Sequence, residues 1–101
     1  MTAYAVGLYD MHRRDWVEAY RNPVTGLIAK HGGKYLARAS TCRWEMLEGN
    51  RPMITGITVI EFPSMELARS WHRDPEYRPY IELRQAGSQL DLMLVEDPAI
   101  A

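Results

Sequence analysis

The sequence has few of the features that build disulfide, metal, membrane or nucleic-acid sites. Cys42 is the only cysteine among 101 residues, so one chain holds no internal disulfide and no cysteine-built metal cluster. Uncharged stretches such as Pro52 to Ile60 are far shorter than the ~20 apolar residues of a membrane span, and Met1 to Asp10 lacks the basic residues that open a secretory signal. Its 12 basic and 13 acidic residues form no run of one sign. We therefore expect a cytoplasmic protein without membrane or nucleic-acid partners.

Cofactor and metal motifs are also missing. His12 with Asp15 and His72 with Asp74 resemble metal ligands, but neither pair has a third partner at a recognised spacing. Gly32-Gly33 lacks the third glycine and the preceding strand of a phosphate or dinucleotide loop. The sequence predicts neither a dedicated metal site nor a cofactor.

Periodicity divides the chain into extended and helical segments. From Asp15 to His31 apolar residues recur at helical spacing, with Asp15 as the N-cap and Gly32 as the stop. Pro23 should kink or split this helix, because proline lacks a backbone donor. The second strand should bend around Ala39–Cys42 and return through a turn at Glu48–Pro52. The expected strands cover residues 3–9, 33–47, 54–62 and 89–96, and the expected helices cover residues 15–31, 64–74 and about 76–86.

This order, βαββαβ, is that of a ferredoxin-like α+β fold, a single domain over residues 1–101 with a four-stranded antiparallel sheet and helices on one face. Both faces of the inner strands are apolar, since Ile57 and Val59 alternate with Ile60 and Phe62. One layer of helices covers only one face. We therefore expect a homodimer through the open sheet face; a monomer with a solvated face is the alternative.

A series of short motifs resembles a known family. They are His31 to Arg38, Leu47-Glu48-Gly49, Val59 to Ser64, Ala68, Trp71, Asp74 to Tyr77, and Leu94-Val95-Glu96. In this order they resemble the small bacterial family known as domain of unknown function 1330, and the similarity runs from Tyr4 to Glu96. The resemblance implies the dimeric α+β barrel fold and implies no particular reaction. Family members usually carry a glycine pair where this chain has Ala39 to Cys42.

Two side chains are candidate proton acceptors. His31 lies in the apolar arc of the first helix and could act as a general base near neutral pH, or it could only donate to the last helical carbonyls. Glu61 lies in an apolar strand, where an unpaired charge is costly. We expect Glu61 roughly opposite Ser40 and diagonal to Arg38, so a structural ion pair with Arg38 is the alternative to a catalytic carboxylate.

Five further residues are candidates for binding a substrate. Tyr35 and Arg38 should project to opposite faces of their strand unless a bulge intervenes. Arg38 could hold a carboxylate or enolate. Trp71 and Tyr77 could wall a cavity or simply belong to the core, and Arg84 could close the same cavity or lie on a solvated helix face.

The sequence supports two hypotheses about function. The first is a cofactor-independent enzyme or binding protein for a small, partly apolar, anionic or enolisable compound. Related barrels look like isomerases and cofactor-free monooxygenases, which is an analogy of fold alone. The second hypothesis is a non-catalytic, self-associating accessory module.

Overall fold

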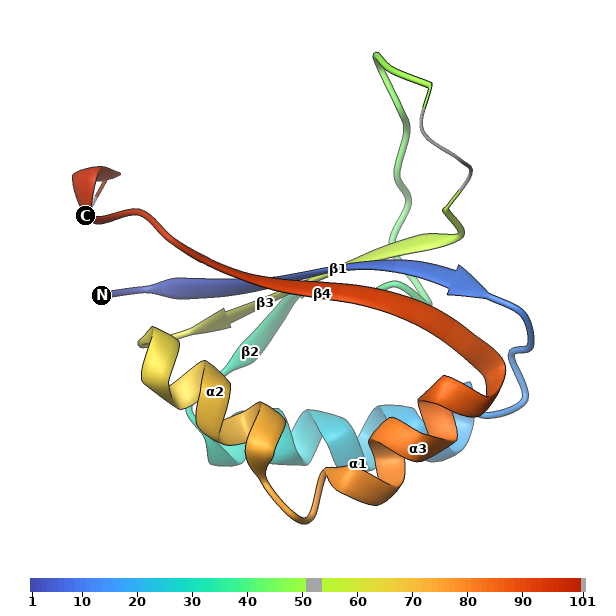
Figure 1. The fold of residues 1–101 in the computed structure, drawn as a ribbon, viewed down its shortest axis with the longest axis horizontal. Coiled ribbons are helices and arrows are strands. Elements are labelled where there is room, and N and C mark those ends of the chain that lie inside the picture. The colour runs from blue at the N-terminus through green and yellow to red at the C-terminus, as the bar shows by residue number, and fades with distance from the viewer. Residues whose placement is uncertain (51–53, 101) are drawn as a thin grey trace.

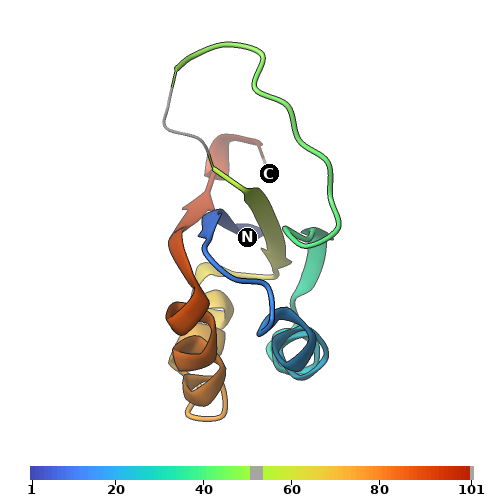
Figure 2. The ribbon, with the colours of Figure 1, turned by 90° about the vertical axis from the view of Figure 1, so that its right-hand side faces the viewer.

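The computed structural model describes residues 1–50 and 54–100 and contains one four-stranded antiparallel sheet in the order β2-β3-β1-β4. The strands are β1 (Ala3–Met11), β2 (Lys34–Ala37), β3 (Gly56–Phe62) and β4 (Ser88–Glu96), and the helices are α1 (Val17–Lys30), α2 (Met65–Arg73) and α3 (Arg78–Gly87), followed by a short 3-10 helix, Pro98–Ile100. The three helices lie on one side of the sheet (Figure 1 and Figure 2). The ferredoxin-like α+β fold is therefore confirmed. No helix in the described part is long and apolar enough to cross a membrane.

Helix α1 differs from the prediction at its start and at Pro23. Asp15 is not the N-cap: Trp16 occupies that position without a side-chain cap, and Asp15 pairs with Arg13 at 3.3 Å. The helix also runs unbroken through Pro23, so the predicted split is wrong. Tertiary packing explains this, because the buried side chains of Tyr20 and Val24 hold the turns before and after the proline against the core.

The predicted second strand over residues 33–47 is wrong beyond Ala37. The amides of Thr41 and Cys42 both donate to the carbonyl of Arg38, so the chain turns there instead of pairing with β3. The shift in register lies between Tyr35 and Ala37 rather than at residues 39–42. Residues 42–50 then extend away from the sheet as an arm without strand pairing (Figure 1). Part of the predicted turn, residues 51 and 52, lies outside the described residues.

Each face of the sheet has its own set of apolar residues. On the helix side, Ala5, Ile60 and Phe62 are almost fully buried. On the other side, Val59 is half-buried, while Met93 and Val95 are about half exposed, at 51% and 49%. The predicted alternation is therefore confirmed, and one apolar sheet face has no cover within the described chain.

Candidate functional site

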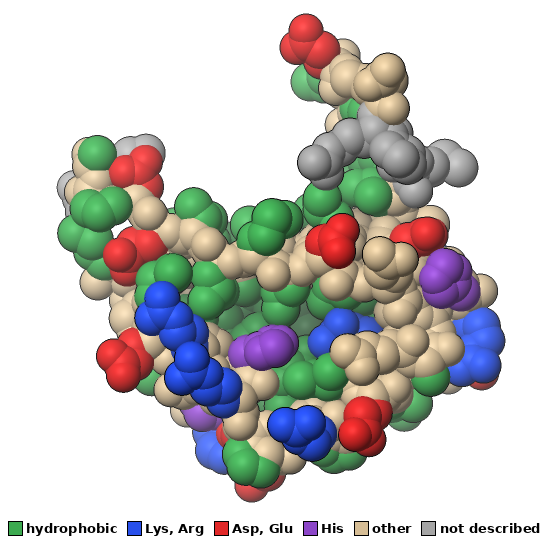
Figure 3. All heavy atoms as spheres, viewed as in Figure 1, with side chains coloured by type: hydrophobic (Ala, Val, Ile, Leu, Met, Phe, Trp, Pro, Cys, Tyr) green, Lys and Arg blue, Asp and Glu red, His purple; other side chains and the backbone are tan. Residues whose placement is uncertain are grey.

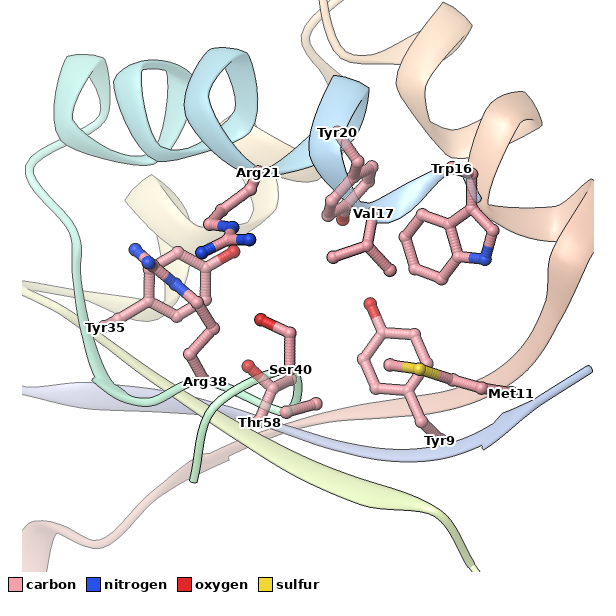
Figure 4. A pocket seen from close by; sticks show the side chains of 11 residues that line it. Tyr9, Met11, Trp16, Val17, Tyr20, Arg21, Tyr35, Arg38, Ser40 and Thr58 are labelled. Carbon is pink, nitrogen blue, oxygen red and sulfur yellow. The ribbon is translucent and has the colours of Figure 1, made fainter. Parts of the chain in front are cut away.

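A small cleft, open to solvent, lies between the first turn of α1 and the sheet (Figure 4). Strand β1, the start of α1, β2, the turn after β2, and β3 all contribute to its wall. The lining residues are Tyr9, Met11, Trp16, Val17, Tyr20, Arg21, Tyr35, Arg38, Ala39, Ser40 and Thr58. The cleft thus joins aromatic and basic side chains from β1, the start of α1, β2 and the turn after β2.

The irregularity in β2 brings two predicted residues together. Because the register shifts between Tyr35 and Ala37, Tyr35 and Arg38 lie on the same side of the sheet and both line the cleft. The guanidinium carbon of Arg38 lies 4.6 Å from the centre of the Tyr35 ring, a distance typical of a cation–π contact. One terminal nitrogen of Arg38 donates to Thr25 Oγ1 at 3.3 Å, whereas its Nε is buried without a hydrogen-bond partner.

The cleft is electropositive. None of its lining residues is acidic, and two of them, Arg21 and Arg38, carry a guanidinium. Arg21 is paired with the exposed Glu18 at 3.4 Å. Within the described ranges, Arg38 has no carboxylate partner at ion-pair distance. Such a wall attracts an anion and repels a cation.

Phenol hydroxyls also line the cleft, from the sheet and from α1. Trp16 packs edge-on against Tyr20, with ring centres 5.2 Å apart, and the Tyr20 hydroxyl lies 2.5 Å from that of Tyr77. Burial raises the pKa of Tyr9 to about 12 and holds the pKa values of Tyr20 and Tyr35 above their usual range. These phenols therefore keep their protons at neutral pH and act as hydrogen-bond donors.

The other predicted binding residues do not line the cleft. Trp71 and Tyr77 belong to the core, with 2% and 0% of their surfaces exposed, and their rings stack 4.8 Å apart. Tyr77 is nevertheless connected to the cleft, because its hydroxyl is hydrogen-bonded to that of Tyr20, which lines the cleft. Arg84 is 5% exposed, so a solvated position on the helix face is wrong for this residue. It lies behind the tyrosines rather than on the cleft surface.

The predicted proton acceptors lie elsewhere. Nε2 of His31 is 2.7 Å from Oδ2 of Asp74, which links the end of α1 to the end of α2. Glu61 stands opposite Lys34 and pairs with it at 3.4 Å. Its expected place opposite Ser40 and diagonal to Arg38 is wrong, because the chain leaves the sheet after Ala37. Neither residue lines the cleft, and their role as proton acceptors stays a prediction.

Sequence reasoning missed the residues that complete the cleft. Tyr9 ends an apolar strand and Tyr20 lies on the apolar arc of α1, so both looked like ordinary core residues. The signal that could have found them is their position: Tyr9 near the end of β1 and Trp16 and Tyr20 at the start of the next helix must lie close together.

Comparison with solved structures defines the class of fold. A protein of unknown function from Rhodopseudomonas palustris, RPA0582, is 18% identical and superposes with a TM-score of 0.73 over 95% of this chain and 82% of that chain. SnoaB from Streptomyces nogalater, a cofactor-independent oxygenase, is 15% identical, with a TM-score of 0.64 over 95% and 92% of the two chains. Rv0793 from Mycobacterium tuberculosis is 15% identical, with a TM-score of 0.53 over 96% and 95%. The shared architecture is the dimeric α+β barrel fold.

The family is shown by the sequence itself. The model of the family described as Domain of unknown function (DUF1330) matches residues 2–98, and this chain belongs to that family. No curated protein matches the chain.

Proposed function

We propose that this chain binds a small, flat, partly apolar anion in the cleft beneath the sheet, as a cofactor-independent enzyme or as a binding protein. The observation that carries the proposal is Arg38. Its guanidinium stacks on Tyr35, has a buried Nε without a partner and borders a cleft with no acidic lining residue. A desolvated guanidinium binds a carboxylate or enolate through paired, charge-assisted hydrogen bonds.

The other residues that line the cleft indicate the shape and polarity of the rest of the ligand. Tyr9, Trp16, Tyr20 and Tyr35 offer aromatic surfaces, and Met11 and Val17 add aliphatic ones. A pocket of this composition favours a planar ring or conjugated system over a sugar or a long polar chain.

The chemistry available in the cleft is hydrogen-bond donation. The lining residues include neither a histidine nor a carboxylate, and the buried phenols stay protonated at neutral pH. A compound that arrives as an anion, or that ionises readily near neutral pH, therefore suits the cleft better than one that needs a strong base. SnoaB, which needs no cofactor for its oxygenase reaction, supports such chemistry by analogy of fold alone.

Binding of 1-naphthoate and of the neutral 1-naphthamide, followed by amide chemical shifts in nitrogen-15 NMR, tests the proposal. We expect 1-naphthoate to bind more tightly and to move the signals of residues around the cleft. Arg38→Gln should weaken naphthoate binding about tenfold or more. Arg14→Gln, an exposed arginine outside the cleft, is the matched control. Equal affinity of Arg38→Gln and the wild type for naphthoate, or no binding at all, would refute the proposal.

We also propose that two copies associate through the open sheet face. Val59, Met93 and Val95 form its apolar part, and the arm adds Trp44 and Leu47, exposed at 36% and 88%. The arm and the C-terminal segment both project on this side of the sheet (Figure 1), and hydrophobic side chains gather between them (Figure 3). A second sheet would cover this surface, as the fold class suggests.

The same face is the observation that favours the alternative function, a non-catalytic module whose main property is self-association. Binding of an aromatic anion in the cleft separates the two functions, because the module needs no ligand. The cytoplasmic location stays a prediction.

A further inference from the structure

Arg84 is a buried cation without an acidic partner. Only 5% of its surface is exposed, and its Nε has no hydrogen-bond partner. No carboxylate among residues 1–50 and 54–100 lies within ion-pair distance of it. An isolated buried charge is costly, so its neighbours must compensate for it. Among them, the hydroxyl oxygen of Tyr77 accepts a hydrogen bond from the guanidinium, and the pKa of Arg84 stays high although burial opposes it.

The direction of the hydrogen bonds in this cluster follows from the chemistry of its groups. A guanidinium only donates, so the oxygen of Tyr77, which lies against Arg84, accepts from it. A phenol has a single hydrogen. Tyr77 therefore donates that hydrogen to the oxygen of Tyr20, 2.5 Å away. The hydrogen of Tyr20 then points to the oxygen of Tyr9 and is available to a ligand oxygen that lies between the two hydroxyls.

The far end of this series of hydrogen bonds, at Tyr20, lies at the cleft. Tyr20 and Tyr9 both line the cleft, whereas Tyr77 and Arg84 do not. Figure 4 shows the hydroxyls of Tyr9 and Tyr20 directed toward one another from opposite walls, away from Arg38 and Tyr35 at the other end. Burial raises the pKa of Tyr9 to about 12 and that of Tyr20 well above its usual range, so both hydrogens are present at neutral pH.

We propose that Tyr20 and Tyr9 form an oxyanion subsite, in which they donate hydrogen bonds to one ligand oxygen while Arg84, through Tyr77, orients the hydroxyl of Tyr20. This inference rests on the proposed function and deepens it. Arg38 holds an anionic or acceptor group at one end of the cleft, and the two phenols hold a second oxygen at the other. The substrate class is therefore a flat aromatic or enolic acid with oxygen functions at both ends, such as a hydroxyaryl carboxylate. Tyr77 and Arg84 are positioning residues.

The probe for this subsite is 4-nitrophenol, whose nitro group can accept from Arg38 and whose ionisation is visible as colour. The phenolate should bind more tightly than the phenol, so the bound probe should ionise at a lower pH than the free probe. Tyr20→Phe and Tyr9→Phe should each weaken phenolate binding about tenfold. Neither variant should change the binding of nitrobenzene, which lacks the phenolic oxygen. Tyr80→Phe, a half-buried tyrosine outside the cleft, is the matched control.

The positioning residues need a separate measurement. Because loss of Arg84 can unfold the core, Tyr77→Phe is the better variant. It removes the hydrogen bonds that link Arg84 to Tyr20 and leaves the hydroxyls of Tyr9 and Tyr20 in place. We expect about a threefold loss of phenolate affinity, and ionisation of the bound probe at a pH closer to that of the free probe. Unchanged ionisation in Tyr77→Phe would refute the orienting role of Arg84 and Tyr77.

The outcomes separate this inference from the proposed function. If Arg38→Gln loses 4-nitrophenolate while Tyr20→Phe and Tyr9→Phe bind it as the wild type does, the cleft binds anions and the oxyanion subsite is wrong. If the wild type binds neither 4-nitrophenolate nor 1-naphthoate, both proposals are wrong.

Discussion

The indole of Trp16 lies directly against the α-carbon of Gly87, so closely that a β-carbon on Gly87 would be 2.4 Å from Cδ1 of Trp16. The indole nitrogen donates to the carbonyl of Arg13 at 2.8 Å, and the amides of His12 and Arg13 both donate to the carbonyl of Gly87. This contact fastens the start of α1 to the junction of α3 and β4. Since Trp16 also lines the cleft, the absence of a side chain at residue 87 helps to shape the site.

Gly87→Ala should therefore destabilise the protein and disturb the cleft. The new methyl group must displace the indole, and overpacking of this kind costs about 1 to 3 kcal/mol. We expect a lower midpoint in urea unfolding and weaker binding of 1-naphthoate. Gly26→Ala is the control, because a β-carbon there meets nothing within 4 Å. Alanine inside an exposed helical turn should raise stability by roughly 0.5 to 1 kcal/mol. Equal stability of Gly87→Ala and the wild type would show that the indole moves aside freely.

The fold could be predicted from the sequence because it depends on local periodicity. Alternation in β3 and helical spacing in α1 place most elements, and Ser64 caps α2 as expected, accepting from the amide of Leu67 at 3.1 Å. The exception is the segment after Ala37. Its composition allows an extended strand, but the turn at Arg38 satisfies its backbone groups with local hydrogen bonds. Hydrophobic periodicity does not tell whether such a local turn or pairing with a neighbouring strand is more stable.

The site was less predictable because it depends on contacts between distant residues. Tyr35 and Arg38 share the cleft only because of an irregularity at Leu36 that no residue pattern marks. The role of Tyr20 depends on its hydrogen bond with Tyr77, 57 residues away, and the role of Arg84 depends on the phenols around it. Residue type alone suggested a solvated arginine and core tyrosines.

Asp74 should make stability depend on pH. Its side chain accepts hydrogen bonds from His31, Lys30 and the amide of Glu76, at 2.7, 2.9 and 2.9 Å. These bonds, that of His31 first, hold the pKa of Asp74 well below its usual range. A carboxyl whose pKa is lower in the folded state stabilises the fold above its unfolded pKa, near 4, and this contribution is lost as the pH falls further.

Asp74→Asn should accordingly lower the thermal midpoint by several degrees at pH 7, and the difference from the wild type should shrink as the pH falls below about 4. Thermal unfolding followed by circular dichroism across this range measures it. Asp10→Asn, an exposed aspartate without an ion pair among the described residues, should change little at any pH. A deficit in Asp74→Asn that stayed constant down to pH 2 would mean that the carboxylate charge contributes nothing.

Val59→Glu should separate two associated copies. Val59 pairs with Val6 of β1 and with Ala37 of β2, so it lies well inside the open sheet face rather than at its rim. A carboxylate there remains solvated in a single chain but would be buried between two sheets without a partner, which is strongly unfavourable. Sedimentation velocity should therefore show a dimer for the wild type and a monomer for Val59→Glu, with the same far-ultraviolet circular dichroism. Gln85→Glu introduces the same change of charge on exposed α3 and should remain dimeric. A wild type that sediments as a monomer at micromolar concentration would contradict association through this face. A dimeric Val59→Glu would show that the interface lies on another surface.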